Sequence, residues 1–108
     1  MSIPVALDEL DSVLGAYPWG YLVTVGDGDR AHTLAVPTVW RDGTLHVTIG
    51  RSTRANATAR PAVTMMFPPD DGFGFSLIVD GTLAVEGDTA VFTPLKAVLH
   101  RPALHDDD

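Results

Sequence analysis

The sequence contains no cysteine, and it contains half as many basic as acidic residues. Without cysteine there is no disulfide framework and no thiolate chemistry, so the chain suits a reducing compartment. Seven Lys and Arg residues against 14 Asp and Glu residues give a net charge of -7 and a pI of about 4.7. The broad basic surface that binds the phosphates of a nucleic acid is therefore not expected.

Long apolar runs are also missing, and acids stand near the start of the chain, where a signal peptide carries bases. We therefore expect a cytoplasmic protein that does not associate with a membrane. The four histidines, His32, His46, His100 and His105, lack the spacing of metal ligands, so no metal site is expected. A chain of 108 residues is expected to form one domain, residues 1–108, which is marginal for burying a cofactor unaided and so favours a dimer.

Alternating apolar and β-branched residues predict six strands, at residues 20–25, 30–40, 43–49, 62–67, 75–86 and 89–92. Asp80 and Gly81 interrupt the fifth strand, which predicts a β-bulge there. Apolar residues at helical spacing predict a helix within residues 2–16, and shorter helices are expected at residues 52–59 and 94–100. The predicted fold is mainly β with short helices, a six-stranded, mostly antiparallel barrel, because closure removes exposed strand edges.

The most informative stretch runs from residue 37 to residue 61. Asp42-Gly43 lies between two β-prone segments, and glycine takes the positive φ that a two-residue hairpin turn needs. The second strand of this hairpin leads to Arg51-Ser52-Thr53-Arg54, at the expected start of a helix. Unpaired backbone N–H groups, hydroxyls and guanidinium groups could converge there on one anion. An ordinary solvated helix start uses the same residue types, so both interpretations stay open.

These features, in this order, resemble the pyridoxamine 5'-phosphate oxidase-like flavin-binding split barrels. In the oxidases, a strand leads into a Ser-Arg-Lys motif, a short helix and Asn-Pro. In this chain Val47-Thr48-Ile49 leads into Ser52-Thr53-Arg54 and then into Arg60-Pro61. The resemblance covers roughly residues 20–86 and implies a homodimeric split barrel with flavin mononucleotide (FMN) at the subunit interface.

The resemblance also implies, by position in these motifs, which residues hold the cofactor. Thr48, Ser52, Thr53 and Arg54 would serve the phosphate and the ribityl chain, with Arg51 supplying the charge that Thr53 lacks. Pro37, Thr38 and Val39 would offer backbone groups to the flavin ring. Ser76 corresponds to a polar residue near the start of a later strand.

The function implied by the resemblance is an FMN-dependent oxidoreductase that acts on a small molecule. A cofactor that carries the redox chemistry agrees with a sequence in which no carboxylate pair and no nucleophile motif stands out. The alternative is a non-catalytic protein that binds flavin, deazaflavin or haem on the same dimeric barrel. If the last helix closes over the pocket, His100 could meet the substrate or serve as a haem ligand.

Overall fold

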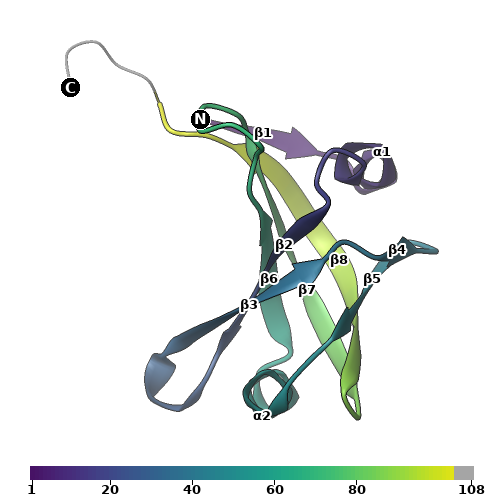
Figure 1. Ribbon diagram of the computed structural model, residues 1–108, viewed down its shortest axis with the longest axis vertical. Helices are drawn as coiled ribbons and strands as arrows, with labels where there is room; N and C mark the ends of the chain where they lie inside the picture. The colour runs from purple at the N-terminus through teal and green to yellow at the C-terminus, as the bar shows by residue number, and fades with distance from the viewer. Residues whose placement is uncertain (104–108) are drawn as a thin grey trace.

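The computed structural model describes residues 1–103 (Figure 1), so His105 and the acidic end of the chain lie outside the described residues. The helices are α1 (Leu10–Leu14) and α2 (Arg51–Ala59), with 3-10 turns at Leu7–Glu9 and Asp27–Asp29. No helix within residues 1–103 is long and apolar enough to cross a membrane. The strands are β1 (Ser2–Val5), β2 (Trp19–Val25), β3 (Ala31–Pro37), β4 (Trp40–Arg41), β5 (Thr44–Thr48), β6 (Ala62–Phe67), β7 (Ser76–Glu86) and β8 (Thr89–His100).

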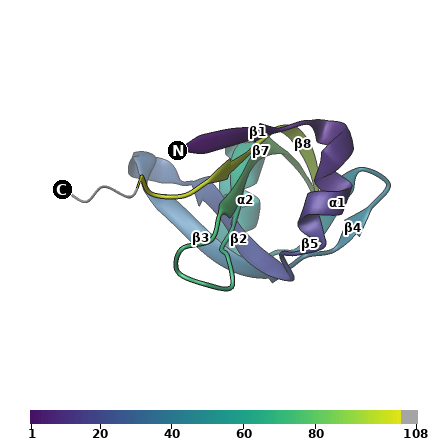
Figure 2. The same ribbon diagram turned by 90° about the horizontal axis from the view of Figure 1, so that it is seen from above.

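The strands form one antiparallel sheet in the order β3-β2-β6-β7-β8-β5-β4, with β1 added to β8. The two ends of this order, β3 and β4, are joined in the chain by only Thr38 and Val39. The sheet must therefore curl until its ends meet, and Figure 2 shows the strands arranged around a common axis. The result is a split barrel, mainly β with short helices, as predicted, although it has eight strands where six were expected.

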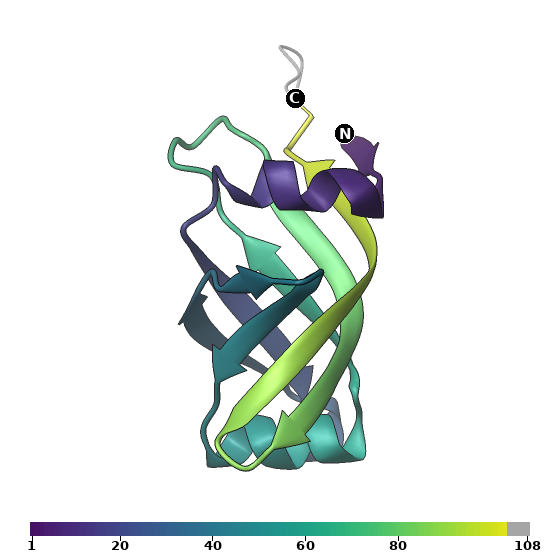
Figure 3. The same ribbon diagram turned by 90° about the vertical axis from the view of Figure 1, so that its right-hand side faces the viewer.

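The interior of the barrel is apolar, and a short helix lies across each end (Figure 3). Inward side chains of β2, β6, β7 and β8 are almost fully buried: Leu22, Met65, Phe67, Leu77, Val79 and Phe92. At one end α1 buries Leu10 and Leu14, and at the other end α2 buries Thr53 and Ala57. Burying two residues spaced three or four apart is what one face of a helix allows.

The predicted helix within residues 2–16 is wrong over its first part, where Ser2–Val5 forms β1. The apolar residues there fit a helix, but β1 pairs with the last residues of β8, from Val5↔Ala97 to Ser2↔His100. Pairing with a distant strand overrides the local pattern. Only Leu10–Leu14 is α-helical, and Gly15 follows its last residue.

The predicted helix at residues 94–100 is also wrong, because β8 continues through it to His100. Proline is tolerated in a strand at a bulge, and the register between β7 and β8 shifts beside Gly81, whose partner is Pro94. The bulge itself was predicted, and it is confirmed between Asp80 and Gly81.

Gly81 has no room for a side chain, since a Cβ atom there would collide with the Thr93 carbonyl oxygen and the Phe92 ring. We expect Gly81→Ala to lower the free energy of unfolding in urea by about 1–3 kcal/mol, the usual cost of overpacking. Gly72→Ala is the matched control, because nothing lies within 4 Å of its Cβ position. It should change the stability by less than about 0.5 kcal/mol. Equal effects of the two substitutions would contradict the packing described for the bulge.

Candidate functional site

The hairpin of β4 and β5 fixes which side chains of β5 face outward. Asp42 and Gly43 both have positive φ, 53° and 82°, as in the two-residue turn that the sequence predicted. Leu45, Val47 and Ile49 are buried, and the alternate residues Thr44, His46 and Thr48 are more exposed. The predicted alternation along β5 is confirmed.

The start of α2 follows directly, with Gly50 preceding Arg51. The first backbone hydrogen bond of the helix runs from the N–H of Arg54 to the carbonyl of Gly50, at 3.0 Å. The N–H groups of Arg51, Ser52 and Thr53 therefore have no helical acceptor, as at every helix start. The first turn contains no acid, so the positive end of the helix dipole is not neutralised by its own side chains.

The side chains of this first turn divide between two faces of the helix. Arg51, Ser52 and Arg54 are exposed, and the two arginines lie three residues apart, on one side of α2. Thr53 is only 1% exposed and packs against the barrel. Of the four predicted anion contacts, Thr53 thus offers its backbone N–H rather than its hydroxyl.

The rest of α2 is fastened to the hairpin between β2 and β3. The amide of Asn56 donates a hydrogen bond to the hydroxyl of buried Thr24, at 3.2 Å. Arg60 forms an ion pair with Asp27, at 3.4 Å. Within the described residues it is the one ion pair, so neither Arg51 nor Arg54 has an acidic partner among residues 1–103.

The segment between β3 and β4 is held by hydrogen bonds that use most of its polar groups. The N–H of Thr38 donates to the Pro18 carbonyl at 2.9 Å, and its hydroxyl donates to the Tyr17 carbonyl at 2.5 Å. The carbonyl of Val39 accepts from the N–H of His46 at 2.9 Å. Within the described residues, the N–H of Val39 has no backbone acceptor. Val39 is therefore the residue of this segment with a donor to offer a ligand.

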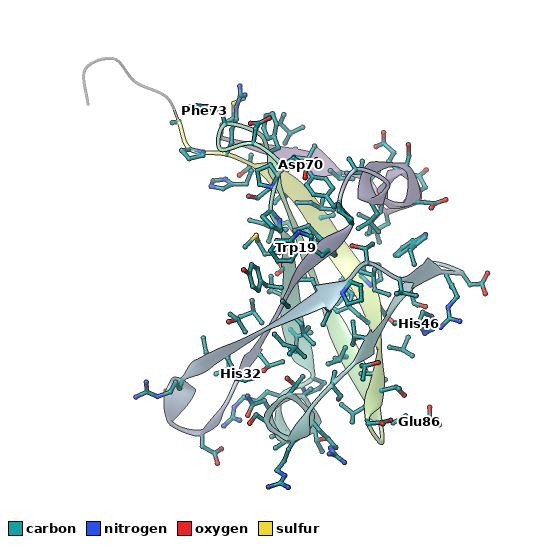
Figure 4. All side chains as sticks on the ribbon, in the orientation of Figure 1. Trp19, His32, His46, Asp70, Phe73 and Glu86 are labelled. Atoms are coloured by element: carbon teal, nitrogen blue, oxygen red, sulfur yellow. The ribbon has the colours of Figure 1, made fainter. Side chains whose placement is uncertain are left out.

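A groove of about 300 Å³ lies on the outer side of β5 and β8, beside this segment. It contains Val39 and Thr48, two of the residues predicted to contact the cofactor, although they come from different parts of the chain. No acidic side chain lines it. Its lining consists of Val39, Arg41, His46, Val47, Thr48, Thr89, Ala90 and Val91, and Figure 4 labels His46.

A second cavity, of about 340 Å³, lies on the other side of the same segment, toward α1. Thr38 and Trp40 line it, whereas Val39 and Arg41 line the groove, as the alternation of an extended chain requires. Pro37 lines neither. The structure thus separates Thr38 and Pro37 from Val39. The second cavity is lined by Asp11, Leu14, Gly15, Tyr17, Pro18, Thr38 and Trp40.

Ser76 and His100 lie far from the groove, at the opposite end of β7 and β8. They face each other in register, and Nδ1 of His100 lies 3.0 Å from the hydroxyl of Ser2. Thr48 is level with Glu86, and residues 76 to 86 of β7 span about 33 Å at the ordinary rise of a strand. One protomer does not bring Ser76 to the predicted site, and the helix that was to carry His100 over the pocket is a strand.

Sequence reasoning missed Arg41, His46, Val47 and the three residues of β8 that line the groove. The alternation along β5 places His46 on the same side as Thr48, so this signal was present. The residues of β8 could not be found in this way, because they depend on the pairing of Thr48 with Thr89, which are far apart in the chain.

Comparisons with known proteins identify both relatives and a fold. No protein-family model matches the sequence. Two uncharacterized proteins, from Mycobacterium bovis and Mycobacterium tuberculosis, are each 42% identical to this chain over an alignment 119 residues long. The alignment covers 94% of this chain and 84% of each relative.

Four solved structures are similar in fold at low sequence identity. A protein of the pyridoxinephosphate oxidase family from Clostridium acetobutylicum has a TM-score of 0.68 at 14% identity, covering 88% of this chain and 87% of its own. The FAD binding protein of Mycobacterium smegmatis has a TM-score of 0.65 at 17% identity, covering 94% of this chain and 100% of its own. An F420 reductase has a TM-score of 0.65 at 21% identity, covering 81% of this chain and 94% of its own. HutZ, a haem storage protein from Vibrio cholerae, has a TM-score of 0.59 at 15% identity, covering 84% of this chain and 91% of its own. The fold is that of the pyridoxamine 5'-phosphate oxidase-like split barrels.

Tyr17, beside the second cavity, gives a pH-dependent prediction. Its hydroxyl donates to the Phe75 carbonyl at 2.7 Å, and burial raises the pKa of Tyr17 above its ordinary value. The stability that neutral Tyr17 contributes is therefore present below about pH 10 and is lost as the pH rises through the raised pKa. Tyr17→Phe should lower the free energy of unfolding by about 1 kcal/mol at neutral pH. The difference from wild type in urea denaturation should shrink above about pH 10, and a constant difference would refute this assignment.

Proposed function

We propose that this chain, which belongs to one family with the two mycobacterial proteins and has the split-barrel fold, is an FMN-dependent oxidoreductase acting on a small molecule. The observation that carries the proposal is the groove. Val39 and Thr48, assigned to the cofactor from separate parts of the sequence, line it together. Thr48 also stands three residues before Arg51, at the exposed start of α2.

The chemical character of these residues fits each part of FMN. The backbone N–H groups at the start of α2 and the guanidinium groups of Arg51 and Arg54 suit the phosphate. The hydroxyl of Thr48 suits the polar ribityl chain. Apolar lining from Val39 and Val91 suits a planar ring, and the lining contains no acid that would repel an anionic cofactor.

The protein's own part in the reaction is to bind and to orient. The flavin, when bound, would supply the hydride chemistry, so no side chain of the protein need act as a nucleophile. Val39 lines the groove, and its N–H has no backbone acceptor within residues 1–103, so we propose that this N–H donates a hydrogen bond to the cofactor. Such a fixed donor stabilises negative charge that develops beside it. A chain without cysteine suits the reducing cytoplasm, where we expect the enzyme to act.

Similar structures supply both the support for a flavin and the alternative. One is an FAD binding protein, one is an F420 reductase and one stores haem. The second candidate is therefore a carrier without turnover that binds flavin, deazaflavin or haem in the same groove. The position of His100, bonded to Ser2 at the far end of β8, argues against its use as a haem ligand in one protomer.

The dimer is proposed from an apolar row on the outer face of the sheet. Outward-facing residues at one level of six strands are in register and largely half-buried, and they are Ala35, Tyr21, Met66, Ile78, Val98 and Pro4. Burying such a row against a second copy removes apolar surface from water. We propose a homodimer with the cofactor at the subunit interface, where the partner subunit would complete an open groove.

Arg54→Ala tests the cofactor site. Loss of a charge-assisted contact of about 1.5–3 kcal/mol should weaken FMN binding about 10- to 150-fold in a fluorescence titration. Arg30→Ala is the control, because Arg30 is an exposed arginine between β2 and β3 that does not line the groove. Unchanged affinity in the Arg54 variant would count against the phosphate site at α2.

The same preparation separates an enzyme from a carrier. We expect the FMN-loaded protein to lose its flavin absorbance when a reduced nicotinamide nucleotide is added, and to recover it in air. Titrations with deazaflavin and haemin should give weaker binding than FMN. Tight FMN binding without any reduction would favour the carrier, and a Soret band on tight haemin binding would favour haem.

Ile78→Lys tests the proposed interface. A charge at the centre of the apolar row is costly to bury, so the variant should be monomeric in sedimentation or light-scattering measurements, while wild type has twice the monomer mass. Thr82→Lys is the control, since Thr82 is exposed on the same face of the same strand but outside the row. A dimeric Ile78 variant would place the interface elsewhere.

A further inference from the structure

We propose that Arg41 and His46 form an anion subsite in the groove and that the substrate carries a carboxylate group. This inference rests on the proposed function, because it takes the groove to be the place where the substrate meets the cofactor. The two residues come from β4 and β5, on either side of the Asp42-Gly43 turn, and both line the groove. Neither was expected from the sequence to contact a ligand.

The hydrogen bonds around His46 decide which ring nitrogen carries hydrogen. The hydroxyl of Thr44 donates to the carbonyl of Arg41 at 3.0 Å. The oxygen of this Thr44 hydroxyl also lies 3.0 Å from Nε2 of His46. A hydroxyl has one hydrogen, so Thr44 must accept in the second bond and Nε2 must donate. Nε2–H is therefore the tautomer that this network assigns.

Nδ1 of His46 is then left for a ligand. Within residues 1–103, Nδ1 makes no hydrogen bond. When the ring is protonated, Nδ1 also carries a hydrogen and donates, so a carboxylate is a fitting partner. The bond between Thr44 and Nε2 fixes the orientation of the ring, so the ring does not need to be ordered when the ligand binds.

The charges around His46 favour an anion rather than a cation. Arg41 is the one charged residue that lines the groove, and no acid lines it. The residue opposite His46 on β8 is Val91, which is uncharged. The acids in or beside the neighbouring turns are Asp42, Glu86 and Asp88, and none of them lines the groove.

This subsite is distinct from the proposed phosphate site at α2. His46 lies two residues before Thr48 on β5, about 7 Å along the strand, and Arg51 follows three residues later. The groove thus has cationic groups toward the β4–β5 turn, apolar side chains in its lining, and a second cationic region at α2. Because the helix start supplies N–H groups that suit a phosphate, the Arg41 end is left for an anionic group of the substrate. A small carboxylate held by Arg41 and His46, with the apolar lining left for the ring of the proposed cofactor, matches this order of groups.

The test uses benzoate as the probe and benzyl alcohol as its uncharged counterpart. In the full-length protein with ¹⁵N-labelled histidine, benzoate should shift the ring signals of His46 saturably. Benzyl alcohol should leave them in place, and loss of the signals in His46→Gln identifies them.

Arg41→Gln should weaken benzoate binding at least about tenfold, the usual loss of one charge-assisted contact. Arg30→Gln should leave it unchanged. If Arg41→Gln has lost its fold by circular dichroism, Arg41→Lys replaces it and should weaken binding as well.

Parallel titration with FMN distinguishes the two proposals. If FMN binds but benzoate does not shift His46, or if benzyl alcohol shifts it equally, the carboxylate subsite is refuted and the cofactor site stands. If benzoate binds with the expected dependence on Arg41 but FMN does not bind, the proposed function is refuted, and with it the assignment of the carboxylate to a substrate.

Discussion

The structure depends on one constraint of connectivity. β3 and β4 are the two ends of the strand order, yet only Thr38 and Val39 lie between them in the chain. A sheet whose ends are two residues apart cannot lie flat, so its apolar face is turned inward and becomes the core. The same two residues separate the groove from the second cavity, since Val39 lines one and Thr38 lines the other. Closure of the barrel and the position of the site therefore have a common cause.

Electrostatics give this site its chemical character. The chain as a whole is acidic, but the groove has no acidic side chain in its lining and contains Arg41, and the start of α2 adds Arg51 and Arg54. An acidic body makes such a region stand out, because the local field differs in sign from that of the surrounding surface. Small anions are the ligands that this distribution of charge favours.

Local signals predicted the parts of the fold that local chemistry decides. The Asp42-Gly43 turn, the alternation along β5, the bulge at Gly81 and the start of α2 were all readable from the sequence, since each depends on φ preferences or on adjacent side chains. The strand at Ser2–Val5 and the continuation of β8 to His100 were not, because each forms against a strand from the other end of the chain. The predicted site residues divide in the same way. Val39 and Thr48, which were predicted to contact the cofactor, line the groove together, whereas the strand register of one protomer carries Ser76 about 33 Å away from Thr48.

The barrel has an open seam beside β3, because β3 ends the strand order and is not paired with β4. This seam has a consequence for the behaviour of the protein at high concentration. Within the described residues, β3 pairs with β2 alone, so its other side presents peptide groups that have no strand partner. Edges of this kind recruit strands from other molecules and start aggregation. Pro37, at the end of β3, has no N–H to give to an added strand. It therefore limits how far intermolecular β-structure can extend along the seam.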